Sequence, residues 1–353
     1  MTSNAAIPTL SDLLSLSDSQ YRIFDIGRKI DKISKEYFTK IEHNQVPYPF
    51  PSQGHAFIAI AFWQKKATSP YLWFVKLPLD ERGLLNLVAR DHFIAIIIEA
   101  LGSDITVDPT EQQEALLKNN PYHFTPSQYK LAALNSKIKG ELKQAPSEYF
   151  NHSAQYFSGT LAWDDWHKIG VQGITDFAAR INEKDYDQQI SQAIPHIASE
   201  VLLPLCSALE NEKLSPTLIE ALLKRAQQPE CTDIELQHLL RSIASNCQHP
   251  HVVSFIENLL KQKGLSDEVL IVLSGRCWAV WQTPHLLVSY FEQIIAKQDM
   301  PLFHAIFKDL VAIPLIRPQV FQCMRDPSRS SALSHAIGLL FHTAESSVVE
   351  TKH

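Results

Sequence analysis

Apolar residues recur at a fixed interval in the C-terminal third of the chain. Pro216, Pro250, Pro284 and Pro318 are spaced by 34 residues. Positions at constant offsets from these prolines are apolar in all four units, although only 45% of the chain is hydrophobic. These positions are Leu218, Val252, Leu286, Val320, Ile219, Val253, Leu287, Phe321, Leu222, Ile256, Tyr290, Met324, Leu239, Leu273, Phe307 and Phe341. The pattern predicts an internal repeat.

Each repeat is expected to be a pair of helices. A proline at the first helical position loses no helical hydrogen bond, so each of the four prolines can begin a helix. The residues that precede them are Ser215, His249, Thr283 and Arg317. A second helix should follow roughly sixteen residues later, where apolar positions again recur at helical spacing. One of its columns holds Glu235, Val269, Phe303 and Ile337, of which Glu235 is the exception.

The repeat extends upstream of the first proline. The same columns continue at Val201, Leu205 and Leu209, which predicts a preceding helix that Pro204 should bend. The period is that of tetratricopeptide repeats, but their Trp-x-x-Leu-Gly-x-x-Tyr signature is missing, and the units are more similar to irregular HEAT repeats. We therefore expect residues 196–345 to form an α-α superhelix, a HEAT-like solenoid, followed by a disordered tail over residues 346–353.

The N-terminal third predicts a mixture of helix and strand. Leu10–Leu16 has the pattern of a short amphipathic helix. Tyr21–Ile26 is rich in aromatic and β-branched residues, which predicts a short strand that ends at Gly27. Apolar residues then recur at helical spacing, which predicts a helix running on to about His43. These residues are Ile26, Ile30, Ile33, Tyr37 and Ile41.

Two further strands and a long helix are expected next. The proline-dense segment 47–51 (PYPFP) must be extended, because each proline disfavours helix in the residue before it. Gly54–Trp63 and Tyr71–Leu77 are apolar and aromatic, which predicts neighbouring antiparallel strands joined by a polar loop. Asp80–Leu101 should then be a helix that Asp80 caps and Gly102 ends.

Residues 106–195 are expected to be a helical connector. Thr125-Pro126 combines a hydroxyl cap with a proline at the first turn, which predicts a helix start. The four predicted helices are Thr110–Lys118, Gln128–Leu142, Ser147–Phe157 and Gly173–Ile181. The fold class is thus mainly α, with a small α+β N-terminal domain over residues 1–105 and a C-terminal helical-repeat array.

Several strings in the N-terminal third resemble a known family. They are QYRIFDIGRKI, PYPFP, the FW at residues 62–63, and WFVKLPLDERGLLNLVARD. Together they are similar to a family of uncharacterised bacterial proteins catalogued only as a domain of unknown function. The resemblance covers most of the chain and implies a bacterial cytoplasmic protein. It brings no catalytic residues to carry over.

The charge balance argues against a dedicated nucleic-acid binder. Asp and Glu number 38 against 32 Lys and Arg, for a net charge of −6, whereas such domains usually carry a clear basic excess. The most basic stretch comprises Arg28, Lys29, Lys32 and Lys35. Asp31 and Glu36 interrupt it, which favours a solvated helix face.

Cysteine usage and apolar run lengths predict a cytoplasmic protein without membrane insertion. The five cysteines are an odd number, widely spaced and without a Cys-x-x-Cys pair, which is typical of reduced thiols in a helical core. The N-terminal sequence MTSNAAIPTL lacks the basic and apolar regions of a secretory signal. The longest apolar stretches are far shorter than the ~20 residues that span a bilayer.

Two short polar clusters are candidate chemical sites. Asp164, Asp165 and His167 could bind a metal or act in acid–base chemistry, or could simply be acidic residues in the first turn of a helix. The cysteine and two histidines at positions 247, 249 and 251 could bind zinc in a loop. A buried cysteine beside a capping histidine is the favoured interpretation, because no fourth ligand lies nearby. We predict no metal site and no cofactor.

A third cluster lies at one inter-helix turn. Arg276, Trp278, Trp281 and His285 combine arginine with aromatic residues, the types that anchor protein interfaces. The alternative is that both tryptophans pack between adjacent repeats, since large aromatic side chains are mostly buried. We take these four residues as the candidate binding residues.

The function predicted from these patterns is that of a non-enzymatic adaptor or regulatory protein. A stack of helix pairs leaves a long surface, and such surfaces usually bind other proteins, so the expected partner is a protein. The alternative is an enzyme with a site in the head, residues 1–105, or at its junction with the helices. Polar residues that could line that site are Asp25, Arg28, Lys76, Asp80, Arg82, Arg90 and Asp91. They are equally well explained as ion pairs around a small sheet.

Overall fold

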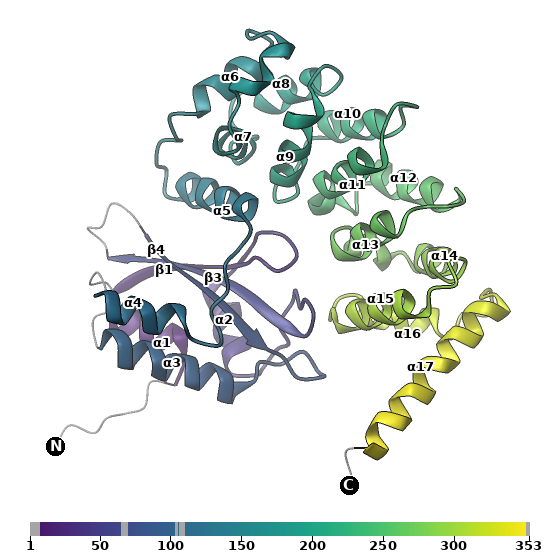
Figure 1. The fold of residues 1–353 in the computed structure, drawn as a ribbon, viewed down its shortest axis with the longest axis horizontal. Helices are drawn as coiled ribbons and strands as arrows, with labels where there is room; N and C mark the ends of the chain where they lie inside the picture. The colour runs from purple at the N-terminus through teal and green to yellow at the C-terminus, as the bar shows by residue number, and fades with distance from the viewer. Residues whose placement is uncertain (1–7, 65–69, 103–104, 106–109, 351–353) are drawn as a thin grey trace. The chain divides into compact units, whose positions relative to one another are not determined.

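The computed structural model describes residues 8–64, 70–102, 105 and 110–350, and the side chains among them up to residue 340. The chain divides into two compact units, Met1–Leu134 and Asn135–His353, called unit 1 and unit 2 below. Unit 1 contains a four-stranded sheet, and unit 2 is helical (Figure 1). The expected class, mainly α with a small sheet near the N-terminus, is confirmed.

The sheet of unit 1 is antiparallel throughout. Its strands are β1 (Ser19–Asp25), β2 (Asp31–Ile33), β3 (His55–Gln64) and β4 (Tyr71–Pro78), in the spatial order β2-β1-β3-β4. Four apolar residues face one another across all four strands, because Ile33 pairs with Ile23, Ile23 with Ile60, and Ile60 with Trp73. Cross-strand rows of this kind stabilise a sheet and fix its register.

Four helices complete unit 1. They are α1 (Leu10–Leu16), α2 (Lys35–Glu42), α3 (Leu87–Leu101) and α4 (Glu111–Lys118). Buried side chains of α1, α2 and α3 join those of the strands in one hydrophobic core. An isolated two-stranded hairpin is marginal in water, whereas four strands with an apolar face packed against helices form a stable unit.

Several sequence predictions for unit 1 are confirmed. The helix at residues 10–16 and the strand near residues 21–26 are present, and the two apolar runs pair as β3 and β4. Thr110 caps α4 through a capping box with Gln113, and Gly102 ends α3 with a positive φ of 69°. The polar loop expected between β3 and β4, residues 65–69, lies outside the described residues.

The helix predicted from Ile26 to His43 is wrong in its first half. Residues 31–33 form β2, and only Lys35–Glu42 is helical. The Asp25 carboxylate accepts a hydrogen bond from the Arg28 backbone N–H, which closes the turn after β1. Ser34 then caps α2 by accepting from the Tyr37 N–H. Pairing between strands therefore overrides a helical apolar pattern.

One predicted helix start and one predicted helix cap are also wrong. Asp80 does not begin α3, because its carboxylate accepts from the N–H groups of Arg82 and Leu84 and closes a turn. The helix begins seven residues later, where Asn86 accepts from the Ala89 N–H. In α5 (Gln128–Glu141), Ser127 bonds the first turn in place of Thr125-Pro126. In each case a polar residue nearer the helix provides the cap.

Unit 2 is built from short helices in sequence. They are α6 (Phe150–Phe157), η1 (Trp163–Lys168), α7 (Val171–Ala178), α8 (Tyr186–Ala193), α9 (Ser199–Leu209), α10 (Pro216–Ala226), α11 (Asp233–Ser242), η2 (Ala244–Asn246), α12 (Pro250–Leu260), α13 (Asp267–Gly275), η3 (Trp278–Gln282), α14 (Pro284–Ile295), α15 (Met300–Ala312), α16 (Arg317–Cys323) and α17 (Ser331–Glu350). The segment expected as a tail, residues 346–353, thus belongs to α17 up to Glu350. None of the helices in the described ranges has the length and apolarity that crossing a membrane requires.

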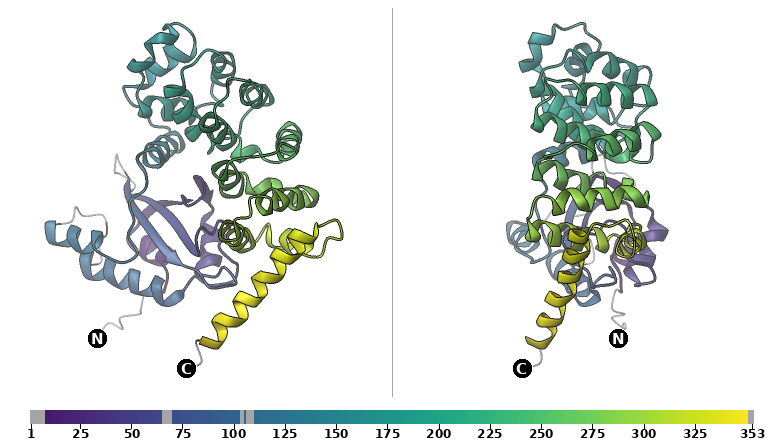
Figure 2. Two further views of the ribbon diagram at one scale, coloured as in Figure 1. Left: turned by 45° about the vertical axis from the view of Figure 1, so that its right-hand side comes forward. Right: turned by 90° about the vertical axis from the view of Figure 1, so that its right-hand side faces the viewer.

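Helices of unit 2 stack in two rows (Figures 1 and 2). The first row contains α8, α10, α12, α14 and α16, and the second row contains α9, α11, α13 and α15, each helix packed against the next in its row. Pro216, Pro250 and Pro284 begin α10, α12 and α14, whereas Pro318 is the second residue of α16. The predicted helix pairs are therefore present.

The first apolar column lies in the interior between the rows, whereas the next column is not buried in every unit, since Phe321 of α16 is 47% exposed. The four residues that lie two positions after each proline are completely buried: Leu218, Val252, Leu286 and Val320. Glu235, the exception in its column, is buried as well, and it accepts hydrogen bonds from the Ser199 hydroxyl at 2.6 Å and from Arg225 at 3.2 Å. Pro204 lies inside α9, as expected.

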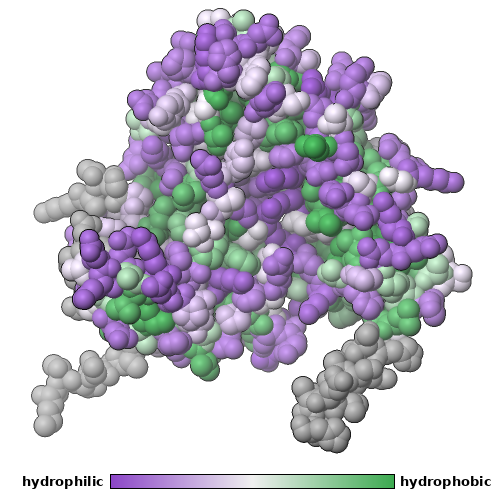
Figure 3. All heavy atoms as spheres, in the orientation of Figure 1, coloured by the Kyte–Doolittle hydropathy of each residue, from purple (hydrophilic) through white to green (hydrophobic). Residues whose placement is uncertain are grey.

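On the face drawn in Figure 3, apolar residues form separate groups among hydrophilic ones.

Glu42 connects three helices of unit 1. Its buried carboxylate accepts from the backbone N–H groups of Leu10 and Ser11 at 2.7 and 3.1 Å and from the Ser11 hydroxyl at 2.5 Å. Its backbone carbonyl accepts from Arg90 of α3. Burial raises the pKa of Glu42, and the hydrogen bonds from Ser11 oppose that rise. The carboxylate thus holds the start of α1 against the end of α2.

Glu42→Ala should lower the free energy of unfolding of unit 1 by about 3 kcal/mol, because buried donors of α1 lose their acceptor. Urea unfolding at neutral pH, followed by hydrogen exchange of the β-strand amides, measures this loss. Glu36→Ala is the matched control, since Glu36 is exposed on the same helix. A loss for Glu42→Ala no larger than for Glu36→Ala would contradict the prediction.

Candidate functional site

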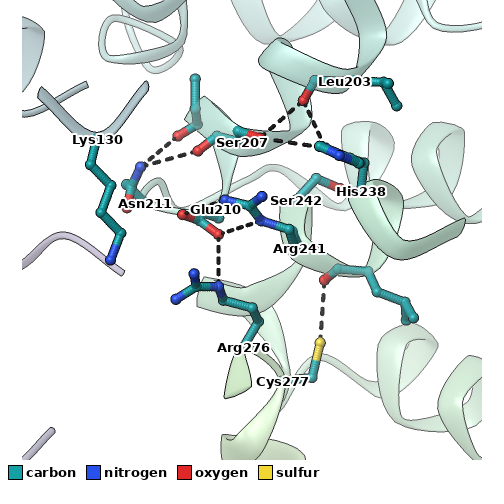
Figure 4. A network of polar contacts seen from close by, with 12 residues as sticks. Lys130, Leu203, Ser207, Glu210, Asn211, His238, Arg241, Ser242, Arg276 and Cys277 are labelled. Atoms are coloured by element: carbon teal, nitrogen blue, oxygen red, sulfur yellow. Dashed lines mark hydrogen bonds and ion pairs between the residues drawn. The ribbon is translucent and has the colours of Figure 1, made fainter. Parts of the chain in front are cut away.

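Three helices of the second row meet at a buried glutamate. Glu210, at the C-terminal end of α9, has a side chain that is only 2% exposed. Arg241, in the last turn of α11, donates from Nε and a terminal nitrogen to its two carboxylate oxygens at 3.1 and 3.2 Å. Arg276, at the end of α13, lies with Nε 3.5 Å from Oε2. Figure 4 shows both arginines pointing toward Glu210 from their own helices.

The residues around Glu210 fix its position. The Ser245 hydroxyl donates to the Glu210 backbone carbonyl at 2.6 Å, and Asn211 donates back to Ala208 of α9. His238 lies with Nδ1 3.1 Å from the Leu203 carbonyl (Figure 4). Burial, and next the charge of Arg241, lower the pKa of His238, which favours a neutral imidazole at neutral pH. The charged members of the network are therefore Glu210 and the two arginines.

Both arginines of the network are partly exposed. Two guanidinium groups face one carboxylate, and each arginine side chain is 23% exposed while Glu210 is nearly inaccessible. Both arginines also lie at helix C-termini, where the helix dipole favours a cation. Guanidinium groups are suited to planar, bidentate recognition of carboxylates. The arrangement therefore neutralises the buried glutamate and leaves part of each arginine side chain exposed.

Exposed apolar side chains lie on the same two helices as these arginines. Ile234 of α11 is 59% exposed and Ile271 of α13 is 50% exposed. Ile234 and Arg241 are seven residues apart, which places them on one side of α11. The second row thus combines arginine with exposed aliphatic residues.

The four predicted binding residues divide into two groups. Trp278 and Trp281 are buried, and Trp281 stacks on Tyr290 with ring centroids 4.3 Å apart. His285 is exposed in the first turn of α14. Arg276 alone belongs to the Glu210 network. The structure therefore places the tryptophans in the interior and leaves Arg276 and His285 at the surface.

The two polar clusters have local structural partners. Asp165 pairs with Lys168 at 2.8 Å within η1. Cys247 is buried and bonds the Ala244 carbonyl, while His249 caps α12 by accepting from the His251 N–H. His251 also lies 3.2 Å from Glu220. Across the described ranges, no group of three or more His, Cys, Asp and Glu residues is arranged to hold a metal ion.

The polar residues predicted in the head do not converge on one site. Asp25 and Arg28 are close, since the Arg28 N–H reaches the Asp25 carboxylate. Asp80 pairs with Arg82 at 2.9 Å, and Arg90 pairs with Asp91 at 2.6 Å. The Lys76 ammonium lies over the Phe57 ring, 5.3 Å from its centroid. Most of these residues are therefore ion pairs or cation–π contacts around the sheet.

Asp25 is the most perturbed carboxyl of the head. It is fully buried, and the Tyr48 hydroxyl donates to its Oδ1 at 2.6 Å. Burial raises the pKa of Asp25 to about 7, although the Tyr48 hydrogen bond and the charge of Lys130 oppose the rise. Lys130 donates to the carbonyls of Ile26 and Gly27 beside it. Tyr48 is also fully buried, so both members of this pair are enclosed in the interior of unit 1.

The sequence patterns missed Glu210 and Arg241. These two residues do not occupy equivalent positions of the 34-residue repeat, so the repeat pattern does not connect them. A polar residue at the end of α9, α11 and α13, namely Glu210, Arg241 and Arg276, was the available signal.

Glu210→Ala should destabilise unit 2 by about 3 kcal/mol, because two partly buried guanidinium groups lose the carboxylate that neutralises them. Chemical unfolding of the full chain, with hydrogen exchange in α9, α11 and α13, measures the effect. Glu220→Ala is the control, since Glu220 is exposed on α10. Equal effects of the two substitutions would argue against the network.

Asp25→Asn should flatten the pH dependence of stability. Asp25 is protonated in the folded state up to a pKa of about 7, whereas in the unfolded chain it ionises near pH 4. The free energy of unfolding of the wild type should therefore fall by about 1.4 kcal/mol per pH unit as the pH rises between these values. It should level off above pH 7. Unfolding of wild type and variant from pH 5 to 8 tests this. Glu81→Gln, at an exposed carboxyl, should keep the wild-type slope.

Comparison with known proteins identifies the family. The family model described as "Protein of unknown function (DUF3549)" matches residues 5–341. No curated protein matches the chain, and neither does any solved structure. The match confirms the resemblance that the N-terminal strings indicated, and it includes the helices around Glu210. Since the family model spans nearly the whole sequence, the chain belongs to the DUF3549 family.

Proposed function

We propose that this chain is a non-enzymatic adaptor or regulatory protein that binds a protein partner through the second row of helices in unit 2. The observation that carries the proposal is the combination on α11 and α13 of exposed Ile234 and Ile271 with Arg241 and Arg276. Arginine is enriched in protein interfaces, and an aliphatic side chain can fill a pocket on a partner.

The repeat architecture supports this proposal. Helix pairs with a period of 34 residues stack in two rows, as in HEAT-like α-solenoids. In such arrays one row buries its apolar columns against the other, and the outward side of a row is left to contact partners. We propose that unit 2 is a solenoid of this kind and that its second row is the binding side.

The chemistry of the surface indicates what the partner offers. Ile234 and Ile271 require apolar side chains, and the cationic edges of Arg241 and Arg276 require carboxylates or backbone carbonyls. Of the four residues predicted from the sequence, Arg276 contacts the partner directly in this proposal. Trp278 and Trp281 support the surface from the interior.

We propose a bacterial cytoplasmic location. All five cysteines are free thiols, which fits a reducing compartment. The net charge of −6 and the mixed charges of the repeat disfavour nucleic acid as the partner. We do not extend the proposal to catalysis, because the perturbed carboxyl of unit 1, Asp25, is enclosed together with Tyr48.

Ile271→Glu should abolish partner capture without unfolding the chain, because the side chain is half exposed and the new carboxylate opposes an acidic or apolar partner. Tagged wild type and variant would be expressed in the source cells and captured proteins compared by quantitative mass spectrometry. A partner recovered with wild type should fall at least about tenfold with Ile271→Glu or Ile234→Glu.

Phe321→Glu is the matched control. Phe321 is 47% exposed, but on α16 of the first row. A partner lost equally with Phe321→Glu would place the binding side elsewhere. Reproducible capture that none of the three substitutions changes would refute the proposal.

A further inference from the structure

A cavity of about 220 Å³ lies in unit 1 beside the edge strand β4. One wall is aromatic. The ring centroid of Phe62 lies 4.4 Å from that of Trp73 and 5.5 Å from that of Tyr71. Trp73 packs edge to face against Phe93, with ring centroids 6.4 Å apart. Rings from β3, β4 and α3 therefore present both faces and edges to the same space.

The opposite wall comes from α4 and the segment after it. Leu117 contributes an aliphatic surface, and Glu114 and Lys118 lie at the rim with their charges 2.6 Å apart. Because this pair is neutral overall, the rim does not select for a charged ligand. A charged molecule would also lose its hydration on entering an apolar cavity. The charge balance favours a neutral occupant.

His123 is a polar residue of the lining that can orient an occupant. Asn120 is engaged in its own turn, where it accepts from the Tyr122 N–H at 2.8 Å. His123 lines the same cavity, and its imidazole makes no hydrogen bond to any described part of the chain. An imidazole can donate or accept according to its tautomer, so it suits a hydroxyl or an N–H group.

The size of the cavity limits the occupant to a small molecule. An apolar cavity of about 150 Å³ in another protein accommodates benzene. The additional space here corresponds to a few more atoms, enough for a substituent or a second fused ring. Specific pockets of this type are mostly apolar with a small number of placed polar groups.

We propose that this cavity binds a neutral, planar aromatic molecule of one ring or two fused rings that carries one hydroxyl or N–H group. The rings of Phe62, Trp73 and Phe93 contact the aromatic body, and His123 binds the polar group. The site lies wholly within unit 1 and is independent of the protein-binding surface proposed for unit 2.

Calorimetry of the full chain with indole and with 4-fluorophenol tests the proposal, and the fluorine resonance of the second probe gives an independent signal. For ligands of this size we expect a Kd on the order of 100 µM. Benzoate and benzamidine, which are close to the probes in size but are charged at neutral pH, should bind at least about tenfold more weakly. Failure of both neutral probes to bind, or equal binding of a charged one, would overturn the proposal.

Two tryptophan substitutions on α4 locate the site. Leu117→Trp fills the cavity and should weaken binding of both probes by about tenfold or more. Leu116→Trp is the matched control, because Leu116 is the neighbouring residue and is 50% exposed. Both variants should keep the thermal unfolding transition of wild type. Should Leu117→Trp fail to fold, Leu117→Phe replaces it as the smaller filling substitution.

His123→Phe tests whether His123 orients the ligand through a hydrogen bond or only contributes to the wall of the cavity. It keeps a ring at the position but removes the hydrogen-bonding group, so affinity for indole and for 4-fluorophenol should fall about fivefold. Affinity for fluorobenzene, which has no such group, should stay within about twofold. Unchanged affinity for all three probes would remove His123 from the site, and binding unchanged by folded Leu117→Trp would place the ligand outside the cavity.

Discussion

A carboxylate buried between helices must be neutralised, and Glu210 meets this requirement with arginines from two other helices. Glu210 lies at the C-terminal end of α9, where the helix dipole disfavours a negative charge. Arg241 and Arg276 reach it from the ends of α11 and α13. Because removing one member would leave uncompensated charge, the three helix ends are held in one arrangement. The exposed side of the second row, with Ile234 and Ile271, depends on that arrangement.

The repeat could be predicted from the sequence because every unit buries the position two residues after its proline, although Phe321, in the next column, is 47% exposed. Leu218, Val252, Leu286 and Val320 are completely enclosed between the rows. Glu235 is the polar exception in its apolar column, yet it is buried as the other members are. Its carboxylate accepts hydrogen bonds from Arg225 and Ser199. A pattern of apolar residues detects burial, and it cannot detect a polar residue that is buried with its own partners.

The errors in the head have a different cause. The residues from Ile26 to Ile41 satisfy helical spacing, yet Ile23 pairs with Ile33 across a turn that the Asp25 carboxylate closes. Strand pairing joins segments far apart in sequence, so local spacing does not determine it. The same holds for the cavity, whose walls come from four separate segments of unit 1. No contiguous motif marks it, and the aromatic strings of β3 and β4 only predict strands.

The two arginines and the two isoleucines make different contributions to the proposed interface. Arg241 already donates two hydrogen bonds to Glu210, and Arg276 lies beside the same carboxylate. A partner carboxylate must therefore share guanidinium groups that are partly satisfied, which limits the affinity gained from charge. Ile234 and Ile271 have no such competitor, because at least half of each side chain is exposed to water. Burial of the isoleucines should thus supply most of the affinity, and the arginines, fixed by Glu210, should supply orientation and selectivity.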